Sequence, residues 1–159
     1  MKPSRRDFLA TAAALPLVAA PAKQAAPPAA RKDLRIMLYQ WTSRDLLNRV
    51  RNMKNKARIR VLLDAEQAKR VGISVHEELV KAGVTIRFVD LPGTGPEAAK
   101  FHHKVVIVDD HTVVTGSYNW SVLADEENHE NIVILHDGPA AKGFAAQFDK
   151  IWESAQEGL

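Results

Sequence analysis

Two short segments of the sequence place together the kinds of side chains that can handle a phosphate group. His102 and Lys104 are two residues apart at the start of an expected strand, so both side chains point to the same face. Ser117 and Asn119 repeat this two-residue step in a turn after the next expected strand. The four side chains can therefore place an imidazole, an ammonium, a hydroxyl and an amide around one phosphate.

The two segments also fit a known motif. Residues 102–109 fit H-x-K-x(4)-D, ending at Asp109, and residues 116–119 fit G-S-x-N. This pattern resembles the catalytic motif of the phospholipase D superfamily, and the wider layout is most similar to its small bacterial endonucleases with a single motif. The resemblance covers roughly residues 31–153.

The resemblance implies a role for each motif residue. His102 is the nucleophile that attacks phosphorus and forms a phosphohistidine intermediate. Lys104 and Asn119 bind the phosphoryl oxygens as charge develops, and Ser117 is a supporting donor. A second histidine protonates the leaving alkoxide and then activates water. Asp109 lies at the far end of the strand from Lys104, where we expect it to brace the turn.

An acidic residue completes the pattern that the resemblance implies. In family members with one motif, a carboxylate eleven residues after the motif's asparagine hydrogen-bonds the other ring nitrogen of the nucleophile. Glu130 occupies this position relative to Asn119. Such a bond would set the tautomer and orientation of His102.

The remaining histidines suggest no further chemistry. His103 points away from His102, and we expect it to pack in the core or behind the site. The others show no metal-ligand spacing and are expected to be structural or exposed: His76, His111, His129 and His136. We therefore predict no metal requirement and no cofactor.

The single copy of the motif predicts a dimer. The mechanism needs two histidines on opposite sides of phosphorus, and family members with one copy form homodimers. We expect a two-fold symmetric dimer with one composite site, in which the two His102 side chains face each other.

The first 32 residues differ in composition from the rest of the chain. Residues 4–9 (SRRDFL) resemble the twin-arginine export signal, and an apolar stretch and an A-x-A site at residues 20–22 follow. We expect residues 1–22 to be a signal peptide, residues 23–32 an Ala/Pro-rich linker, and residues 33–157 the catalytic domain. This arrangement predicts bacterial export to the periplasm or medium.

Composition narrows the possible classes of protein further. The 159 residues contain no cysteine, which excludes a disulfide scaffold, a zinc-thiolate site and a catalytic thiol. No apolar run approaches the ~20 residues of a membrane span.

Charge is divided unequally along the chain. Residues 23–90 hold 15 Lys and Arg against 7 Asp and Glu, whereas residues 91–159 hold 4 against 11. The densest basic stretch, residues 44–60, is a solvated helix face or a surface for polyanions. Its candidate substrate-binding residues are Arg44, Arg49, Arg51 and Lys54.

Hydrophobic patterning predicts a single α/β domain with a mixed or parallel sheet flanked by helices on both faces. The expected strands are residues 35–41, 58–63, 84–89, 104–108, 112–115 and 132–135, and the expected helices are residues 43–56, 74–83 and 139–155. Leu79 and Val80 should face inward, as should Phe144, Phe148, Ile151 and Trp152. The strand and helix that usually open the family fold have no counterpart before residue 35.

Three hypotheses remain for what the protein does and what it acts on. Nucleic acid leads because of the nuclease-like layout and the basic stretch. Phospholipid head groups are the alternative, since their cleavage names the superfamily. The third hypothesis is a nucleic-acid-binding module without catalysis, against which the complete motif argues.

Overall fold

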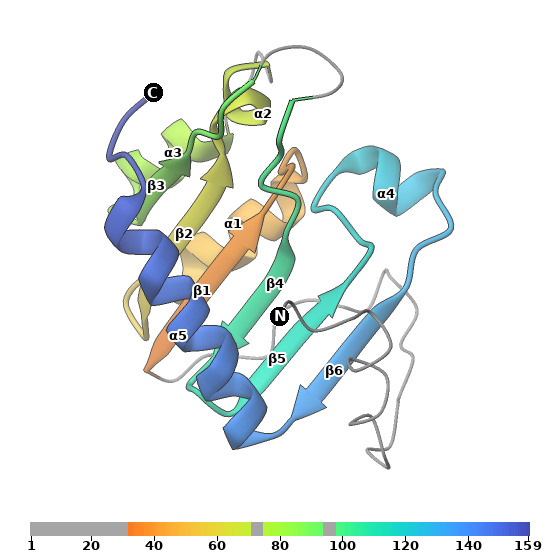
Figure 1. Ribbon diagram of the computed structural model, residues 1–159. Helices are drawn as coiled ribbons and strands as arrows, with labels where there is room; N and C mark the ends of the chain where they lie inside the picture. Colours follow the sequence, from red (N-terminus) through yellow and green to blue (C-terminus); the bar gives the residue numbers. More distant parts are fainter. Residues whose placement is uncertain (1–31, 71–74, 94–97) are drawn as a thin grey trace, which may run out of the picture.

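The computed structural model describes residues 32–70, 75–93 and 98–159, and within these ranges the chain forms one α/β domain (Figure 1). A six-stranded sheet has the order β3-β2-β1-β4-β5-β6. The strands are β1 (Asp33–Leu38), β2 (Arg58–Asp64), β3 (Thr85–Val89), β4 (Lys104–Val108), β5 (Thr112–Gly116) and β6 (Ile132–His136). The helices are α1 (Arg44–Met53), α2 (Ala65–Arg70), α3 (Val75–Lys81), α4 (Val122–Glu126) and α5 (Gly138–Ser154).

The sheet is mixed. Strands β1, β2 and β3 are parallel, whereas β4 runs antiparallel to β1 and continues into antiparallel β5 and β6. Leu38 at the end of β1 pairs with Leu63 on one side and with Lys104 at the start of β4 on the other. The carboxyl ends of β1 and β2 therefore meet the amino end of β4 at one edge of the sheet.

Helices cover both faces of the sheet, as the sequence predicts. Helix α5 crosses one face, and α1, α2 and α3 lie on the other (Figure 1). Alternate residues of β1 serve the two layers: Leu34 and Ile36 pack toward the three helices, and Met37 packs with Phe148 of α5. Burial on both faces explains why the central strands are continuous apolar runs.

Side-chain caps fix the starts of the helices. Ser43 Oγ accepts a hydrogen bond from Leu46 N, and Asp137 Oδ1 accepts one from Ala140 N. Each contact satisfies a backbone donor that has no partner inside the helix. Ser74, the first residue of the helix expected at residues 74–83, lies outside the described residues.

Several element predictions need correction. Strand β1 ends at Leu38 rather than at residue 41. The residues after it bend toward Trp120, whose carbonyl accepts hydrogen bonds from Thr42 N and Ser43 N. The short helices α2 and α4 were not predicted. Val80 is 53% exposed rather than inward-facing, although Leu79 is fully buried as expected. Of the four α5 residues expected inside, only Phe148 is fully buried, and the other three are half-buried beside it.

The unequal charges of the two halves of the chain are partly matched within the fold. Arg35, buried in β1, contacts Asp110 at 2.5 Å, and Arg60 contacts Asp149 at 2.8 Å. Arg87 contacts Glu157 at 2.5 Å. Basic residues of the first half therefore serve as partners for acidic residues of the second.

The N-terminal predictions remain predictions. The expected signal peptide at residues 1–22 lies outside the described residues, as does nearly all of the linker at residues 23–32. The same holds for the region where an opening strand and helix would lie. Within the described ranges, none of the helices combines the length and apolar character that crossing a membrane requires.

Candidate active site

The segment carrying His102 is held at the edge where β1, β2 and β4 meet. Tyr39 N, directly after β1, donates a hydrogen bond to His103 O at 2.8 Å, and His102 N donates to Lys100 O at 2.9 Å. The His102 side chain is exposed, whereas Lys104 is only 9% exposed. The sheet thus presents one imidazole to solvent above a largely buried ammonium.

His102 and Lys104 are in direct contact. Lys104 Nζ lies 2.9 Å from His102 Nε2, and it also donates to His102 O at 3.3 Å. A lysine ammonium has only donors, so Nε2 must accept and the ring proton resides on Nδ1. Partial burial, followed by the charges of Lys104 and Lys100, lowers the pKa of His102, and Asp64 opposes this shift. His102 is therefore a neutral imidazole near pH 7, the form that acts as a nucleophile.

Tyr39 belongs to the same group, although the sequence places it only in a buried strand. Its ring lies 4.6 Å from the His102 ring in an edge-to-face contact and 5.2 Å from Lys104 Nζ. An aromatic face attracts a cation at this distance. No local sequence signal marks Tyr39, because its contact with His102 depends on the pairing of β1 with β4.

The Gly116-Ser117 step joins β5 to the residues before β6. A β-carbon on Gly116 would lie 2.1 Å from Asn131 O, so only glycine fits. Ser117 N donates to Asn131 O at 3.1 Å, and Asn131 N donates to Ser117 Oγ at 3.0 Å. The motif serine therefore locks this junction, beyond the supporting role that the resemblance implies.

Glu130 does not form the bond expected of it. Its carboxylate accepts hydrogen bonds from the Ser117 hydroxyl and from Asn128 Nδ2, the latter at 3.0 Å. Across the part of the chain that is described, the hydrogen bonds of Glu130 go to Ser117 and Asn128, and none joins it to His102. Glu130 instead acts on Lys104: burial lowers the pKa of Lys104, and the negative charge of Glu130 raises it.

Asn119 presents an unsatisfied polar atom. Its Oδ1 is buried and has no hydrogen-bond partner among the residues described. The neighbours on both sides are fixed: Tyr118 donates to Asp125, and the Trp120 ring packs edge-to-face on Trp41. Burial and the Asp125 carboxylate raise the pKa of the Tyr118 phenol, which therefore stays protonated as the donor. This turn holds the Asn119 amide just after the end of β5, at the same edge of the sheet as the start of β4.

Asp109 lies at the opposite end of β4 from His102. Asp109 and Asp110 both have φ of 52°. Two consecutive residues at positive φ give a tight hairpin turn whose twist matches that of the strands it joins, β4 and β5. Asp109 Oδ1 accepts hydrogen bonds from Lys32 N and Asp33 N, each at 2.9 Å. These bonds tie the β4–β5 turn to the start of β1, at the end of β4 away from His102 and Lys104.

The basic residues of α1 do not join the His-Lys group. Helix α1 starts at the site edge, where Ser43 N donates to Trp120 O, and runs to the opposite edge. Three of the four predicted residues are engaged: Arg44 with Glu78, Arg49 with Asp45, and Lys54 with the carbonyl of Ala82. All four, including Arg51, are exposed. They form a surface separate from His102 and Lys104.

The other histidines are structural or exposed, as expected. The His103 ring packs on Phe101 at 4.8 Å, and the His76 ring packs on Phe88 at 5.1 Å. His136 and His111 both contact the Thr112 hydroxyl, and His129 is exposed. Residues 32–70, 75–93 and 98–159 contain no group of three or more His, Asp or Glu side chains able to hold a metal ion.

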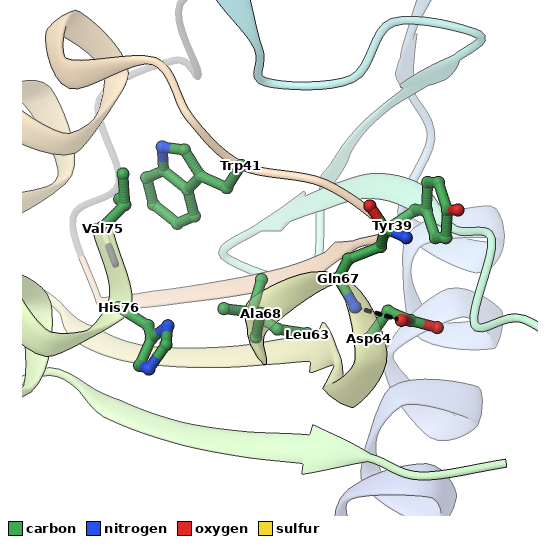
Figure 2. Close-up of a pocket in the computed structure, with 8 residues that line it drawn as sticks. All are labelled: Tyr39, Trp41, Leu63, Asp64, Gln67, Ala68, Val75 and His76. Atoms are coloured by element: carbon green, nitrogen blue, oxygen red, sulfur yellow. Dashed lines mark hydrogen bonds between the residues drawn. The ribbon is translucent and has the colours of Figure 1, made fainter. Parts of the chain in front are cut away.

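A small pocket lies behind Tyr39 (Figure 2). It is lined by Tyr39, Trp41, Leu63, Asp64, Gln67, Ala68, Val75 and His76. Asp64 lies on the Tyr39 side of this pocket, at the carboxyl end of β2, and its carboxylate is hydrogen-bonded to Gln67.

Comparison with known proteins places this arrangement in a family. Residues 28–152 match the family model described as cardiolipin synthase, PLD-like domain. A mitochondrial cardiolipin hydrolase from Homo sapiens is 33% identical over 126 residues, covering 79% of this chain and 47% of the relative. The relative from Chlamydomonas reinhardtii, of the same name, is 32% identical over 78% of this chain and 53% of its own length. The chain thus spans about half the length of these curated relatives.

Two solved structures share the fold. Nuc from Salmonella typhimurium, a phospholipase D family member, aligns with a TM-score of 0.70 and 25% identity over 81% of this chain and 83% of its own. NucT from Helicobacter pylori aligns with a TM-score of 0.71 and 25% identity, covering 81% and 84%. Since the family model covers most of the chain and both structures match nearly their whole length, this protein belongs to the phospholipase D-like family.

Proposed function

We propose that this protein is a metal-independent phosphodiesterase that works through a phosphohistidine intermediate and cleaves nucleic acid. The observation that carries the proposal is the contact between Lys104 Nζ and His102 Nε2. It places a cation beside a neutral imidazole nitrogen at an exposed edge. That pair suits attack on a phosphodiester, where the nucleophile must be unprotonated and the oxygens need a positive partner.

The reaction has two displacements. His102 Nε2 attacks phosphorus and the P–O bond to the leaving group breaks, while a second imidazolium gives its proton to the departing alkoxide. That second imidazole then takes a proton from water, and the resulting hydroxide attacks phosphorus and breaks the P–N bond. Lys104 and the Asn119 amide bind the non-bridging oxygens throughout.

We propose a homodimer as the source of the second imidazole. The exposed His102 is free to face a partner, and the described residues of one chain place no second histidine against it. A two-fold axis beside His102 would bring the two rings together, each supplied by one chain. In one reaction, one His102 would be the nucleophile and the partner's His102 would be the general acid.

The preference for nucleic acid is supported by the exposed basic face of α1. Arg44, Arg49, Arg51 and Lys54 all reach solvent, and phosphate backbones are held mainly by Lys and Arg. Arg44 is the member nearest the site edge. A polyanion longer than one phosphodiester could contact the site and this face together.

Phospholipid is the second candidate substrate, and one feature of the surface favours it. Val122 and Leu123 of α4 are 50% and 59% exposed, directly after the Trp120 turn that flanks the site. Exposed apolar side chains beside a phosphodiesterase site suit contact with acyl chains or the bilayer surface. The relatives named cardiolipin hydrolase are consistent with this alternative.

One experiment separates these substrates. Purified protein and a His102→Ala variant are incubated in EDTA with plasmid DNA, RNA, and vesicles of phosphatidylcholine or cardiolipin. Strand cleavage by the wild type alone supports the nuclease, and head-group release alone supports the lipase. Binding of DNA or RNA without turnover of any substrate supports a binding module and contradicts the proposed enzyme. Activity that is lost in EDTA and restored by a divalent ion contradicts the metal-independent mechanism.

We also propose export by the twin-arginine route, supported by the order of residues 4–22. Expression in a bacterium should yield a periplasmic protein whose N-terminus, read by mass spectrometry, follows the A-x-A site at residues 20–22. Changing Arg5 and Arg6 to lysine should retain the uncleaved precursor inside the cell. Unchanged export of that double variant would contradict the route.

A further inference from the structure

Asp64 is a buried carboxylate that the family motif does not include. It is the last residue of β2, it is 4% exposed, and it lies at the sheet edge that carries His102. No Lys or Arg within the described ranges forms an ion pair with it. A carboxylate in such a place requires hydrogen bonds to offset the lost hydration.

Both oxygens of Asp64 accept from backbone amides. Oδ1 accepts from Gln67 N at 2.9 Å and so caps the start of α2, as the dashed line in Figure 2 marks. Oδ2 accepts from Phe101 N at 2.9 Å, across 37 residues of sequence. Phe101 is the residue immediately before His102 and lies outside any strand. The second bond therefore ties the nucleophile's own backbone to the end of β2.

The remaining contacts of this segment show why that bond matters. His102 precedes β4, so no sheet hydrogen bond to a neighbouring strand fixes its own amide, which bonds only to Lys100 O. The segment is held on one side by Asp64 at Phe101 and on the other by Tyr39 at His103. Without Asp64, the backbone before His102 would lose its bond to β2, although Lys104 and the Tyr39 ring would still contact the imidazole itself.

We propose that Asp64 is a positioning residue for His102, holding the backbone that carries the nucleophile and supplying a fixed negative charge behind it. The proposal rests on the function proposed above for His102. The negative charge of Asp64 opposes the lowering of the His102 pKa by Lys104 and Lys100. The Tyr39 ring packs on the His102 ring, and the charge of Glu130 acts on Lys104.

The test replaces the charge while keeping the shape. In Asp64→Asn one amide proton must face a backbone N–H, so one of the two bonds is removed together with the charge. We expect kcat for bis(p-nitrophenyl) phosphate to fall by up to about 100-fold, the cost of misplacing a reacting group, with KM little changed. Removing the negative charge should lower the pKa of His102, so the acid limb of the pH–rate profile should move to lower pH. An acid limb identical to that of the wild type would overturn the proposal.

Asp90→Asn is the matched control. Asp90 follows β3 at the same sheet edge and is exposed, and it is absent from the charges acting on His102. The same change of charge there should leave kcat and the acid limb as in the wild type. If the acid limb moved equally in both variants, the change in the net charge of the protein would explain the shift. That result would overturn the specific role of Asp64.

Two readouts do not depend on turnover, and they separate failure of this proposal from failure of the proposed function. The His102 ring, assigned by comparison with His102→Ala, can be titrated by NMR in wild type, Asp64→Asn and Asp64→Glu. The asparagine should lower its pKa and the glutamate should restore it in part. In the wild type, the Phe101 amide should exchange slowly with solvent deuterium; fast exchange overturns the proposal even if no variant folds.

Discussion

Lys104 Nζ and His102 Nε2 lie 2.9 Å apart, so the motif lysine contacts the ring nitrogen that the proposed mechanism assigns to attack on phosphorus. This contact does two things in the free protein. It fixes the tautomer, since the lysine can only donate, and it helps to keep the imidazole unprotonated. In the proposed mechanism, the oxygens of a bound phosphodiester replace Nε2 as partners of the ammonium, which releases Nε2 toward phosphorus.

Replacing Lys104 by methionine should therefore change both the rate and the titration of His102. Methionine keeps the apolar volume but removes the charge, so the pKa of His102 should rise toward its ordinary value. Turnover should fall by about 10² to 10³, as when one transition-state donor is removed. NMR titration and kcat measure the two effects. Lys104→Arg is the control that keeps the charge; an unchanged pKa of His102 in Lys104→Met would contradict the coupling.

Stability should fall as the pH is lowered below about 6.5, the ordinary pKa of histidine. Burial lowers the pKa values of His103, His76 and His102 in the folded chain, so the unfolded chain binds more protons in this range. This stabilisation is present above the pKa of the histidines in the unfolded chain. It is lost as the pH falls through that value toward the lower pKa values of the folded chain. Urea unfolding at pH 7.5 and 5.5 measures the difference.

A single variant tests the contribution of one ring to this pH dependence. His103→Gln removes a titrating group that packs on Phe101, so the gap between the two pH values should shrink. His129→Gln, at an exposed position, is the control and should leave the gap as it was. A gap that persists in His103→Gln would show that other groups cause it.

Gly116 should be irreplaceable for a steric reason. An alanine β-carbon would lie 2.1 Å from Asn131 O, a backbone atom that cannot move without displacing Ser117. Gly116→Ala should therefore destabilise the fold by about 1–3 kcal/mol and reduce activity by disturbing the turn that carries Asn119. Chemical denaturation and a phosphodiesterase assay measure both.

The control for this substitution lies in α5. A β-carbon at Gly143 meets nothing within 4 Å, so Gly143→Ala should stabilise the helix by about 0.5–1 kcal/mol. Equal effects at the two glycines would refute the steric explanation and leave only the general cost of changing glycine.

The sequence predicts the sheet and its two layers because both depend on local patterns. Continuous apolar runs indicate strands buried on both faces, and the Pro139 region indicates the start of α5. The short helices α2 and α4 carry too few residues for periodicity to reveal them, and Val80 shows that helical spacing does not say how wide the buried stripe is.

The site shows the same division. Spacing alone predicts His102, Lys104, Ser117 and Asn119, because the two members of each pair are only two residues apart in the chain. Tyr39 and Asp64 are not, because their relation to His102 arises from strand order: β1 and β2 must lie beside β4 before these residues meet it. The role of Glu130 also depends on tertiary contacts, since Ser117 and Asn128 compete for its carboxylate.

If the basic face of α1 binds a nucleic acid backbone, neutralising it should affect long substrates only. Changing Arg44, Arg49, Arg51 and Lys54 together to glutamine should weaken DNA binding at low salt. The dependence on salt should decrease by about 0.9 in log–log slope for each phosphate that the protein no longer neutralises. Turnover of bis(p-nitrophenyl) phosphate should be unchanged. Lys142 and Lys150, exposed on α5 across the sheet, provide a control pair. An equal weakening in that pair would mean that net charge alone matters.

The composite site should make activity depend on two chains at once. If each reaction uses His102 from both partners, a heterodimer of wild-type and His102→Ala chains has no complete site. Two affinity tags allow this heterodimer to be purified directly, and it should be inactive. In a randomly exchanged equal mixture, only about a quarter of the dimers are wild type in both chains, so activity should fall to that level. A heterodimer with half the wild-type activity, or an active monomer by light scattering, would mean that each chain supplies both of its own catalytic groups.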